Sequence, residues 1–235
     1  MPFDTTNVRL PTSLVRSTAD VERRFLAAVY RWMALGLALT ALVAFAVAGS
    51  DAALQVVFGT RFLLVALLLA EVGLVVALSA AVRRLSAAAA GALFVLYSAL
   101  NGVTLSSIFL VYTHTSIATA LLVAAGAFGA MSVFGTVTRR DLSSWSSFLL
   151  MGLIGVVIAS LVNMFLRSDA MAFVISCASV VVFTGLTAYD TQKLRAFARA
   201  GGTSVAAAPV AGALSLYLDF VNLFLALLRL FGRRR

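Results

Sequence analysis

Charged residues, cysteine and histidine are scarce in this chain of 235 residues. Only 11% of the residues are charged, and the chain has one cysteine and one histidine. A single cysteine excludes an internal disulfide and a site built from several thiolates, and Cys177 lies in an apolar run, where it fits a packed interior. His114, in an expected loop, leaves no histidine cluster for catalysis or zinc binding.

Catalytic motifs are missing as well. The chain has no nucleophile elbow, no glycine-rich phosphate loop and no zincin motif. Two aspartates do lie in apolar segments, as in intramembrane aspartic proteases, but without the Gly-x-Gly-Asp pattern of those enzymes. We therefore expect no enzyme and no bound cofactor.

Long apolar segments, in contrast, are abundant in the chain. Hydrophobic residues make up 62% of it and the mean hydropathy is +1.05, whereas soluble domains are about 45–50% apolar. About 20 apolar residues cross a bilayer as a helix, so we predict an all-α polytopic membrane protein with seven transmembrane helices in one domain. The expected spans are 27–49, 62–82, 87–110, 117–137, 145–166, a sixth from Met171 past Asp190, and a seventh from Pro209 to just before Arg233, with a loop at 51–59.

The net charge of +9 describes topology better than nucleic-acid binding, because most basic residues flank apolar runs, where they set orientation. We expect no nucleic-acid partner. A cytoplasmic N-terminal tail (1–24) ahead of the membrane domain (25–235) places twelve of the eighteen basic residues on the cytoplasmic side. Seven full spans would place Arg229 and residues 233–235 on the external side, against this bias. Either the earlier loops dominate the orientation, or the seventh segment is re-entrant and ends in the cytoplasm. We expect seven full spans.

Three acids fall inside spans: Glu71, Asp190 and Asp219. Each costs about 2.5–3.5 kcal/mol on insertion scales. Asp219 lies roughly 12 Å and 18 Å from the two ends of its helix. Ser215 and Asn222 share its face, so this stripe faces protein or water. The alternative is a simple hydrogen-bonded clasp between helices.

Asp190 and Asp219 are expected to meet. A turn at 201–204 lies midway between them, so two antiparallel helices would bring both carboxylates to one height. Helix axes pack about 8–10 Å apart, and like charges that close do not both ionise readily. We predict a coupled, proton-sharing pair, with a solvated Asp190 at the membrane edge as the alternative.

Other polar residues have two interpretations. Glu71, Asn101 and Thr104 are candidates to line an ion pathway, together with Ser215 and Asn222, although interhelical hydrogen bonding is common for such residues. Arg83 ends the second span on the side of Asp190 and could pair with it, or it could be an ordinary flanking base.

Two C-terminal motifs resemble those of the Bax inhibitor family (transmembrane Bax-inhibitor-motif proteins), in its bacterial branch. They are LTAYDTQKL at 186–194 and SLYLDFVNLF at 215–224, followed by LLRLF at 227–231. Supporting segments in the same order are NGVTLS at 101–106, FGT at 134–136, RDLS at 140–143 and LVN at 161–163.

The resemblance implies seven helices with the last at the centre, in a multi-pass cell (inner) membrane protein that acts as a pH-sensitive calcium leak. Asp190 and Asp219 match the family's proton-sharing sensor and would touch Ca²⁺ transiently as it permeates. In the family, an arginine at the cytoplasmic end of the second helix pairs with the first aspartate as a latch. Arg83 is the best match for this arginine, although a strict alignment places Val82 at its position and Arg83 fits only with a shift of one residue. Glu71 matches an acid of the second helix.

The alternative function is that of a membrane modulator of a membrane-bound protease or another membrane complex. There the basic N-terminal tail would carry recognition and the aspartates would be structural. Beyond that protease, the expected partners are the lipid bilayer and Ca²⁺.

Overall fold

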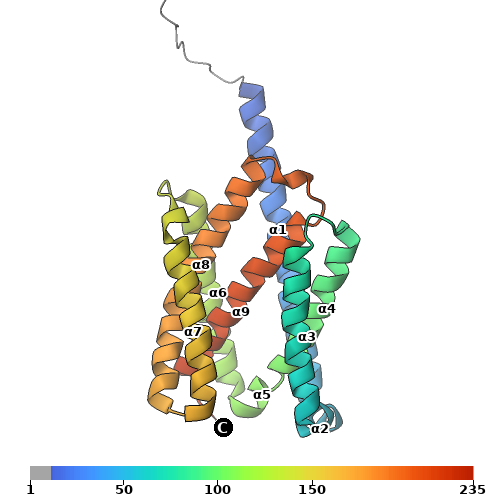
Figure 1. Cartoon of the computed structure of the whole chain (residues 1–235), viewed down its shortest axis with the longest axis vertical. Coiled ribbons are helices and arrows are strands. Elements are labelled where there is room, and N and C mark those ends of the chain that lie inside the picture. The colour runs from blue at the N-terminus through green and yellow to red at the C-terminus, as the bar shows by residue number, and fades with distance from the viewer. Residues whose placement is uncertain (1–11, 235) are drawn as a thin grey trace, which may run out of the picture.

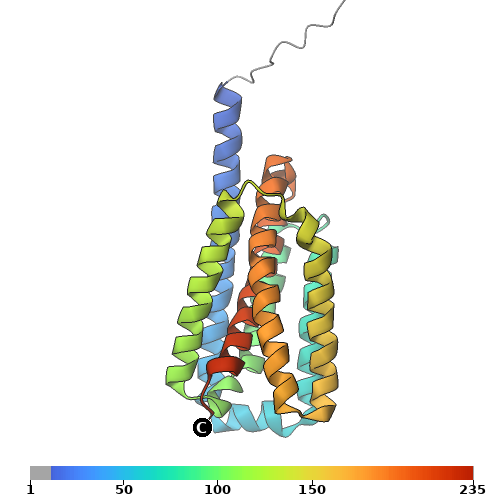
Figure 2. The same cartoon turned by 90° about the vertical axis from the view of Figure 1, so that its left-hand side faces the viewer.

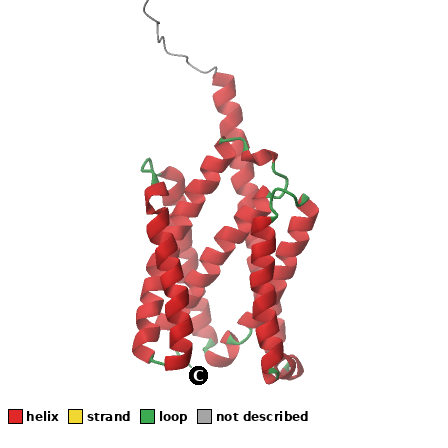
Figure 3. Ribbon diagram, viewed as in Figure 1, coloured by secondary structure: helices red, strands yellow, loops and turns green. Residues whose placement is uncertain are grey.

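The computed structural model describes residues 12–234. Seven helices in this part of the chain are long and apolar enough to cross a membrane, and they stand side by side in a bundle (Figure 1, Figure 3). The prediction of an all-α, seven-span membrane protein is confirmed. The elements are α1 (Thr12–Ala48), α2 (Asp51–Gly59), α3 (Arg61–Ala80), α4 (Ala87–Leu105), α5 (Ile108–Val111), α6 (His114–Val137), η1 (Leu142–Trp145), α7 (Ser146–Leu166), α8 (Asp169–Arg199), η2 (Gly202–Ser204) and α9 (Ala208–Phe231).

The last helix is the central one. In α9, 72% of the most apolar stretch is buried, against 33% or less in the other six spans, and α9 runs obliquely between the surrounding helices (Figure 1, Figure 2). Pro209 stands in its first turn, where the missing N–H costs no hydrogen bond. The sequence therefore places the start of this helix correctly.

The outer helices turn large apolar side chains outward. Phe62 and Phe165 are 82% and 80% exposed, and Leu69 is 67% exposed. In water such a surface would aggregate, but in a bilayer it meets lipid tails.

The seventh segment crosses the whole bundle. α9 starts at the end where α8 finishes, and its C-terminus lies at the other end, near α5 (Figure 1). A re-entrant segment would have returned to its starting side, so the full span is correct.

Two local predictions are wrong, and hydroxyl groups that cap helices explain both of them. The expected loop at 51–59 is helix α2, which the Ser50 side chain caps by accepting from Ala53 N at 3.3 Å. His114 begins α6 instead of lying in a loop, because Thr113 caps that helix. The third span is confirmed at Ala87–Val111, although its helix is interrupted after Leu105, where the hydroxyls of Ser106 and Ser107 bond to backbone carbonyls one turn back.

The predicted tail at 1–24 is partly helical. α1 begins at Thr12 and extends beyond the rest of the bundle as one continuous helix (Figure 1). The remainder of the tail, residues 1–11, lies outside the described residues.

Candidate functional site

Helices α8 and α9 are antiparallel neighbours joined by a tight turn. Gly201 has φ +80, a left-handed conformation that glycine adopts without steric cost, and η2 follows at once. The turn lies where the sequence places it. Because α8 continues to Arg199, Asp190 lies more than two turns before the helix end.

Ser215 of α9 links this helix to Asp190 of α8. Its hydroxyl donates a hydrogen bond to Oδ2 of Asp190, and it lies one helical turn before Asp219 on α9. Among the described residues, no hydrogen bond joins the two carboxylates directly, and the bond from Ser215 ties Asp190 to the face of α9 that carries Asp219.

Asp219 is the more enclosed of the two acids. It is 4% exposed, and its Oδ2 has no hydrogen-bond partner in the described part of the chain. Burying an isolated carboxylate costs free energy, and this cost falls when the group is protonated or has a cation or a hydrogen-bond donor beside it. This side chain is therefore able to respond to a proton or to a passing cation.

A pocket of about 300 Å³ opens beside Asp190 at the end of the bundle where α8 finishes. Val82, Lys193 and Ser215 contribute to its lining along with Asp190, and Lys193 supplies its positive charge. Arg83 is exposed in the turn after α3 and forms no ion pair among the described residues. The latch between Arg83 and Asp190 stays a prediction.

Glu71 belongs to a separate polar network between α1, α3, α4 and α9. Its carboxylate accepts hydrogen bonds from Thr104 Oγ1 at 2.5 Å and Asn101 Nδ2 at 3.2 Å. Asn101 Oδ1 accepts from the Tyr217 hydroxyl at 2.9 Å, and this hydroxyl lies 2.7 Å from Thr40 Oγ1. In this structure, Glu71, Asn101 and Thr104 bond across helices.

Asn222 lies on the other side of Asp219. It lines a pocket of about 420 Å³ between α7, α8 and α9, together with Ser160, Ser179 and Arg229. Ser160 and Arg229 also line a pocket of about 580 Å³ near the C-terminus, which Asp169 lines as well. Polar side chains thus continue from Asn222 to the end of the bundle away from Asp190.

Comparison with known protein families matches residues 22–235 to the family described as "Inhibitor of apoptosis-promoting Bax1". The chain belongs to this family.

Bacterial relatives match the chain over nearly its full length. The inner membrane protein YbhL of Escherichia coli K12 is 49% identical, over 95% of this chain and 97% of the relative. Uncharacterized proteins of Deinococcus radiodurans and Borreliella burgdorferi are 47% and 45% identical, over 93% and 92% of this chain and 94% of each relative. This member of the Bax inhibitor family is thus a multi-pass inner membrane protein.

Two polar contacts of this Bax inhibitor protein were not predicted from its sequence. Gln192 donates to the Arg140 carbonyl at 2.9 Å and accepts from Leu142 N at 2.8 Å, which fixes the loop before η1 against α8. Glu22 of α1 accepts from Arg195 and Arg199 of α8, each at 2.5 Å. Gln192 stands inside the LTAYDTQKL motif, and this position was the only available signal.

Side chains able to hold a resident metal are dispersed in this family member. Within residues 12–234, no three His, Cys, Asp or Glu side chains come together as metal ligands. Asp190 and Asp219 are only two such side chains, one fewer than a group of this kind requires.

Proposed function

We propose that this Bax inhibitor protein is a pH-sensitive Ca²⁺ leak whose passage is controlled by a proton shared between Asp190 and Asp219. The observation that carries the proposal is the enclosure of Asp219. Its Oδ2 is buried without a partner in the described chain, one turn from the serine that binds Asp190. Binding a proton or a cation would remove the free-energy cost of burying this carboxylate without a partner.

The pair would titrate jointly. Like charges this close resist simultaneous ionisation, so their protonation steps belong to the couple and not to either residue. Lys193 faces the same pocket as Asp190 and favours the state in which the couple carries negative charge. Carboxylate oxygens suit Ca²⁺, and a change in the protonation of the pair changes its attraction for the ion.

The pockets on either side of the pair suggest the route. One lies beside Asp190, and the other two follow Asn222 and Arg229 toward the opposite end. In this proposal Ca²⁺ moves down its gradient between them, and the segment of α9 around Asp219 is the narrow point.

The test is Ca²⁺ flux into proteoliposomes at stepped pH. The wild-type protein should show a flux that changes with pH, and the double variant Asp190→Asn/Asp219→Asn should show a flux that does not, because neither amide titrates. Asp51→Asn is the matched control, since Asp51 is an exposed acid at the start of α2. It should keep the wild-type profile.

Two results would contradict the proposal. A double variant with the wild-type pH profile would remove the sensor role from the pair. A purified wild-type protein with no flux above protein-free vesicles would remove the leak itself.

A second candidate function rests on the projecting end of α1. We propose as the alternative that this helix, which extends past the bundle (Figure 1), recognises a membrane protease. A variant lacking residues 1–18 keeps Glu22 and its two arginine partners. If the protease co-purifies with the full chain but not with this variant, and flux is absent from both, the modulator function is favoured.

A further inference from the structure

A basic pocket lies on the surface between α6 and α8, at the end of the bundle from which α1 projects. It measures about 380 Å³ and is formed by the loop before η1 and the last turns of α8. Asp141 is the only acid in its lining. Its basic residues are Arg139, Arg140, Lys193, Arg195 and Arg199.

Three of these bases have no ion-pair partner in the described part of the chain. Arg195 and Arg199 both donate to Glu22, whose carboxylate offsets part of their charge. Arg139, Arg140 and Lys193 are exposed and form no ion pair among the residues that the structure describes, although Lys193 also lines the pocket beside Asp190. With five bases against the two carboxylates of Asp141 and Glu22, the pocket keeps a net positive charge, which favours an anionic ligand.

The loop that carries two of the bases is held in place. Gln192 bonds to it at two points, Arg140 O and Leu142 N. Asp141 caps η1 by accepting from Ser143 N at 2.9 Å, and this backbone bond lowers the pKa of its carboxyl below the usual value. The guanidinium groups are thus presented from a fixed backbone, which reduces the entropy lost when a ligand binds.

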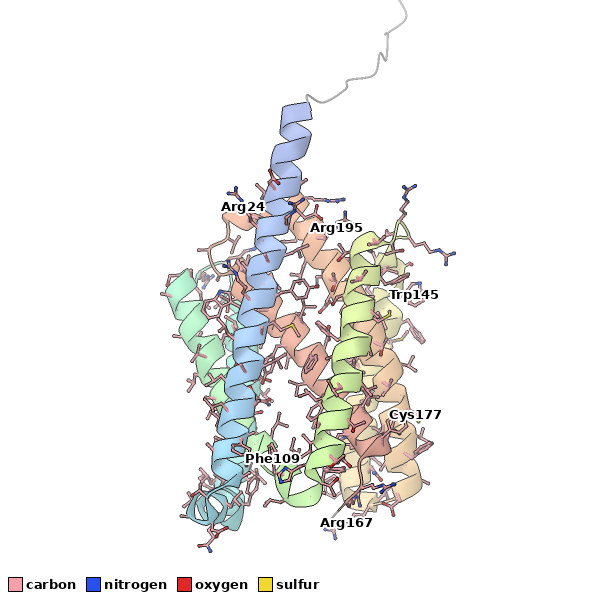
Figure 4. All side chains as sticks on the ribbon, turned by 180° about the vertical axis from the view of Figure 1, so that it is seen from behind. Arg24, Phe109, Trp145, Arg167, Cys177 and Arg195 are labelled. Carbon is pink, nitrogen blue, oxygen red and sulfur yellow. The ribbon has the colours of Figure 1, made fainter. Side chains whose placement is uncertain are left out.

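Trp145 sets the depth of the pocket. This side chain ends η1 and is 57% exposed, and the next helix turns Phe148 outward at 63% exposure. Tryptophan concentrates at the level of the lipid headgroups, and Figure 4 shows Trp145 near the same end of the bundle as Arg195. The pocket therefore lies beside the phosphate layer of one leaflet.

We propose that this pocket binds the phosphate of an anionic phospholipid headgroup in the leaflet on the side of the α1 N-terminus. Arginine forms paired, charge-assisted hydrogen bonds with phosphate, and basic pockets beside spans recognise such headgroups. The proposal is independent of the calcium leak. It also differs from the orientation effect of flanking bases, because it requires these bases in this concavity and not merely on this side of the membrane.

Lipid binding to the detergent-purified full chain tests the proposal. In titrations with phosphatidylglycerol, the wild-type protein should bind and be stabilised against heat, whereas phosphatidylcholine should do neither. Arg139→Gln/Arg140→Gln should bind phosphatidylglycerol roughly 30-fold more weakly, at about fivefold for each basic residue. The matched control is Arg23→Gln/Arg24→Gln, which removes two exposed bases from the same end of the bundle outside the pocket; it should bind as the wild type does.

Three other outcomes would contradict the proposed phospholipid site. Equal losses in the two double variants would mean that only overall charge matters, and an unchanged affinity in Arg139→Gln/Arg140→Gln would exclude the pocket. If that variant is poorly folded, competition on the wild type decides. Inorganic phosphate should displace phosphatidylglycerol only weakly, and a phosphate salt that produces the full stabilisation alone would assign the site to a soluble anion.

Discussion

Tyr217 joins polar groups from three helices in the most enclosed part of the bundle. It is fully buried, and its hydroxyl contacts both Asn101 and Thr40. Replacing it with phenylalanine keeps the ring but leaves the Asn101 carbonyl oxygen without its donor. We expect Tyr217→Phe to reduce the stability by about 1–2 kcal/mol, measured by unfolding in mixed micelles.

Tyr30→Phe is the matched control for this variant. The Tyr30 hydroxyl is only part-buried and lies 3.5 Å from Thr191 Oγ1, at the limit of a hydrogen bond. Its loss should be smaller. Equal losses would show that Tyr217 acts through general packing and not through its hydrogen bonds.

Arg83 allows the proposed latch to be tested separately from the aspartates. A cation beside a carboxylate favours the ionised form, so removing the Arg83 charge should make the couple protonate at a higher pH. We expect Arg83→Gln to move the midpoint of the pH-dependent flux upward by about one unit. Arg84→Gln removes the neighbouring exposed charge and should leave the midpoint in place; a shift in both variants would indicate a surface-charge effect.

Single residues were predictable when their chemistry conflicted with their surroundings. Glu71, Asp190 and Asp219 stand out because a carboxyl group in an apolar run is costly. Their partners do not stand out in the same way. Tyr217 and Thr40 are unremarkable in a span, and they come together only because α9 packs against both α1 and α4, which local sequence does not encode.

At the scale of elements, Gly135 sets the separation of α6 and α8. A Cβ atom there would run into the backbone carbonyl of Ala188 on α8, and backbone cannot move aside as a side chain can. Overpacking of this kind typically costs about 1–3 kcal/mol. We expect Gly135→Ala to lower the thermal stability accordingly.

Gly129→Ala provides the comparison on the same helix. Nothing lies within 4 Å of the added carbon, and alanine favours a helix by up to about 1 kcal/mol over glycine. The substitution should be neutral or stabilising. If both variants lose stability alike, helix propensity and not the approach of α8 governs these sites.

The span boundaries show which features of an element the sequence reveals. Apolar length located all seven spans, since about 20 residues are needed to cross. It missed α2, because nine residues are too few to span a bilayer and their helix depends on a cap at Ser50. The interruption after Leu105 likewise depends on two serine hydroxyls, whose bonding choice is local and leaves the hydropathy unchanged.

For the whole molecule, the central position of α9 places the C-terminus at the end opposite the loop between α6 and η1 (Figure 2). Loop charges set orientation, and among the described residues the bases on the α1 side outnumber those of the tail. We predict a cytoplasmic N-terminus and an external C-terminus. Alkaline phosphatase fused after residue 235 should be active and a green fluorescent protein there dark, with the reverse for fusions after Asp141.

The four arginines near the C-terminus provide the decisive comparison, because they favour the opposite orientation. If the earlier loops dominate, neutralising Arg233, Arg234 and Arg235 should leave both fusion signals unchanged, since removing tail charge only reinforces the existing bias. Adding bases to the tail should eventually weaken the phosphatase signal. A C-terminal phosphatase that is inactive while the Asp141 fusion reports the cytoplasm would mean that α9 does not cross the bilayer, and the central helix of the fold would then need another account.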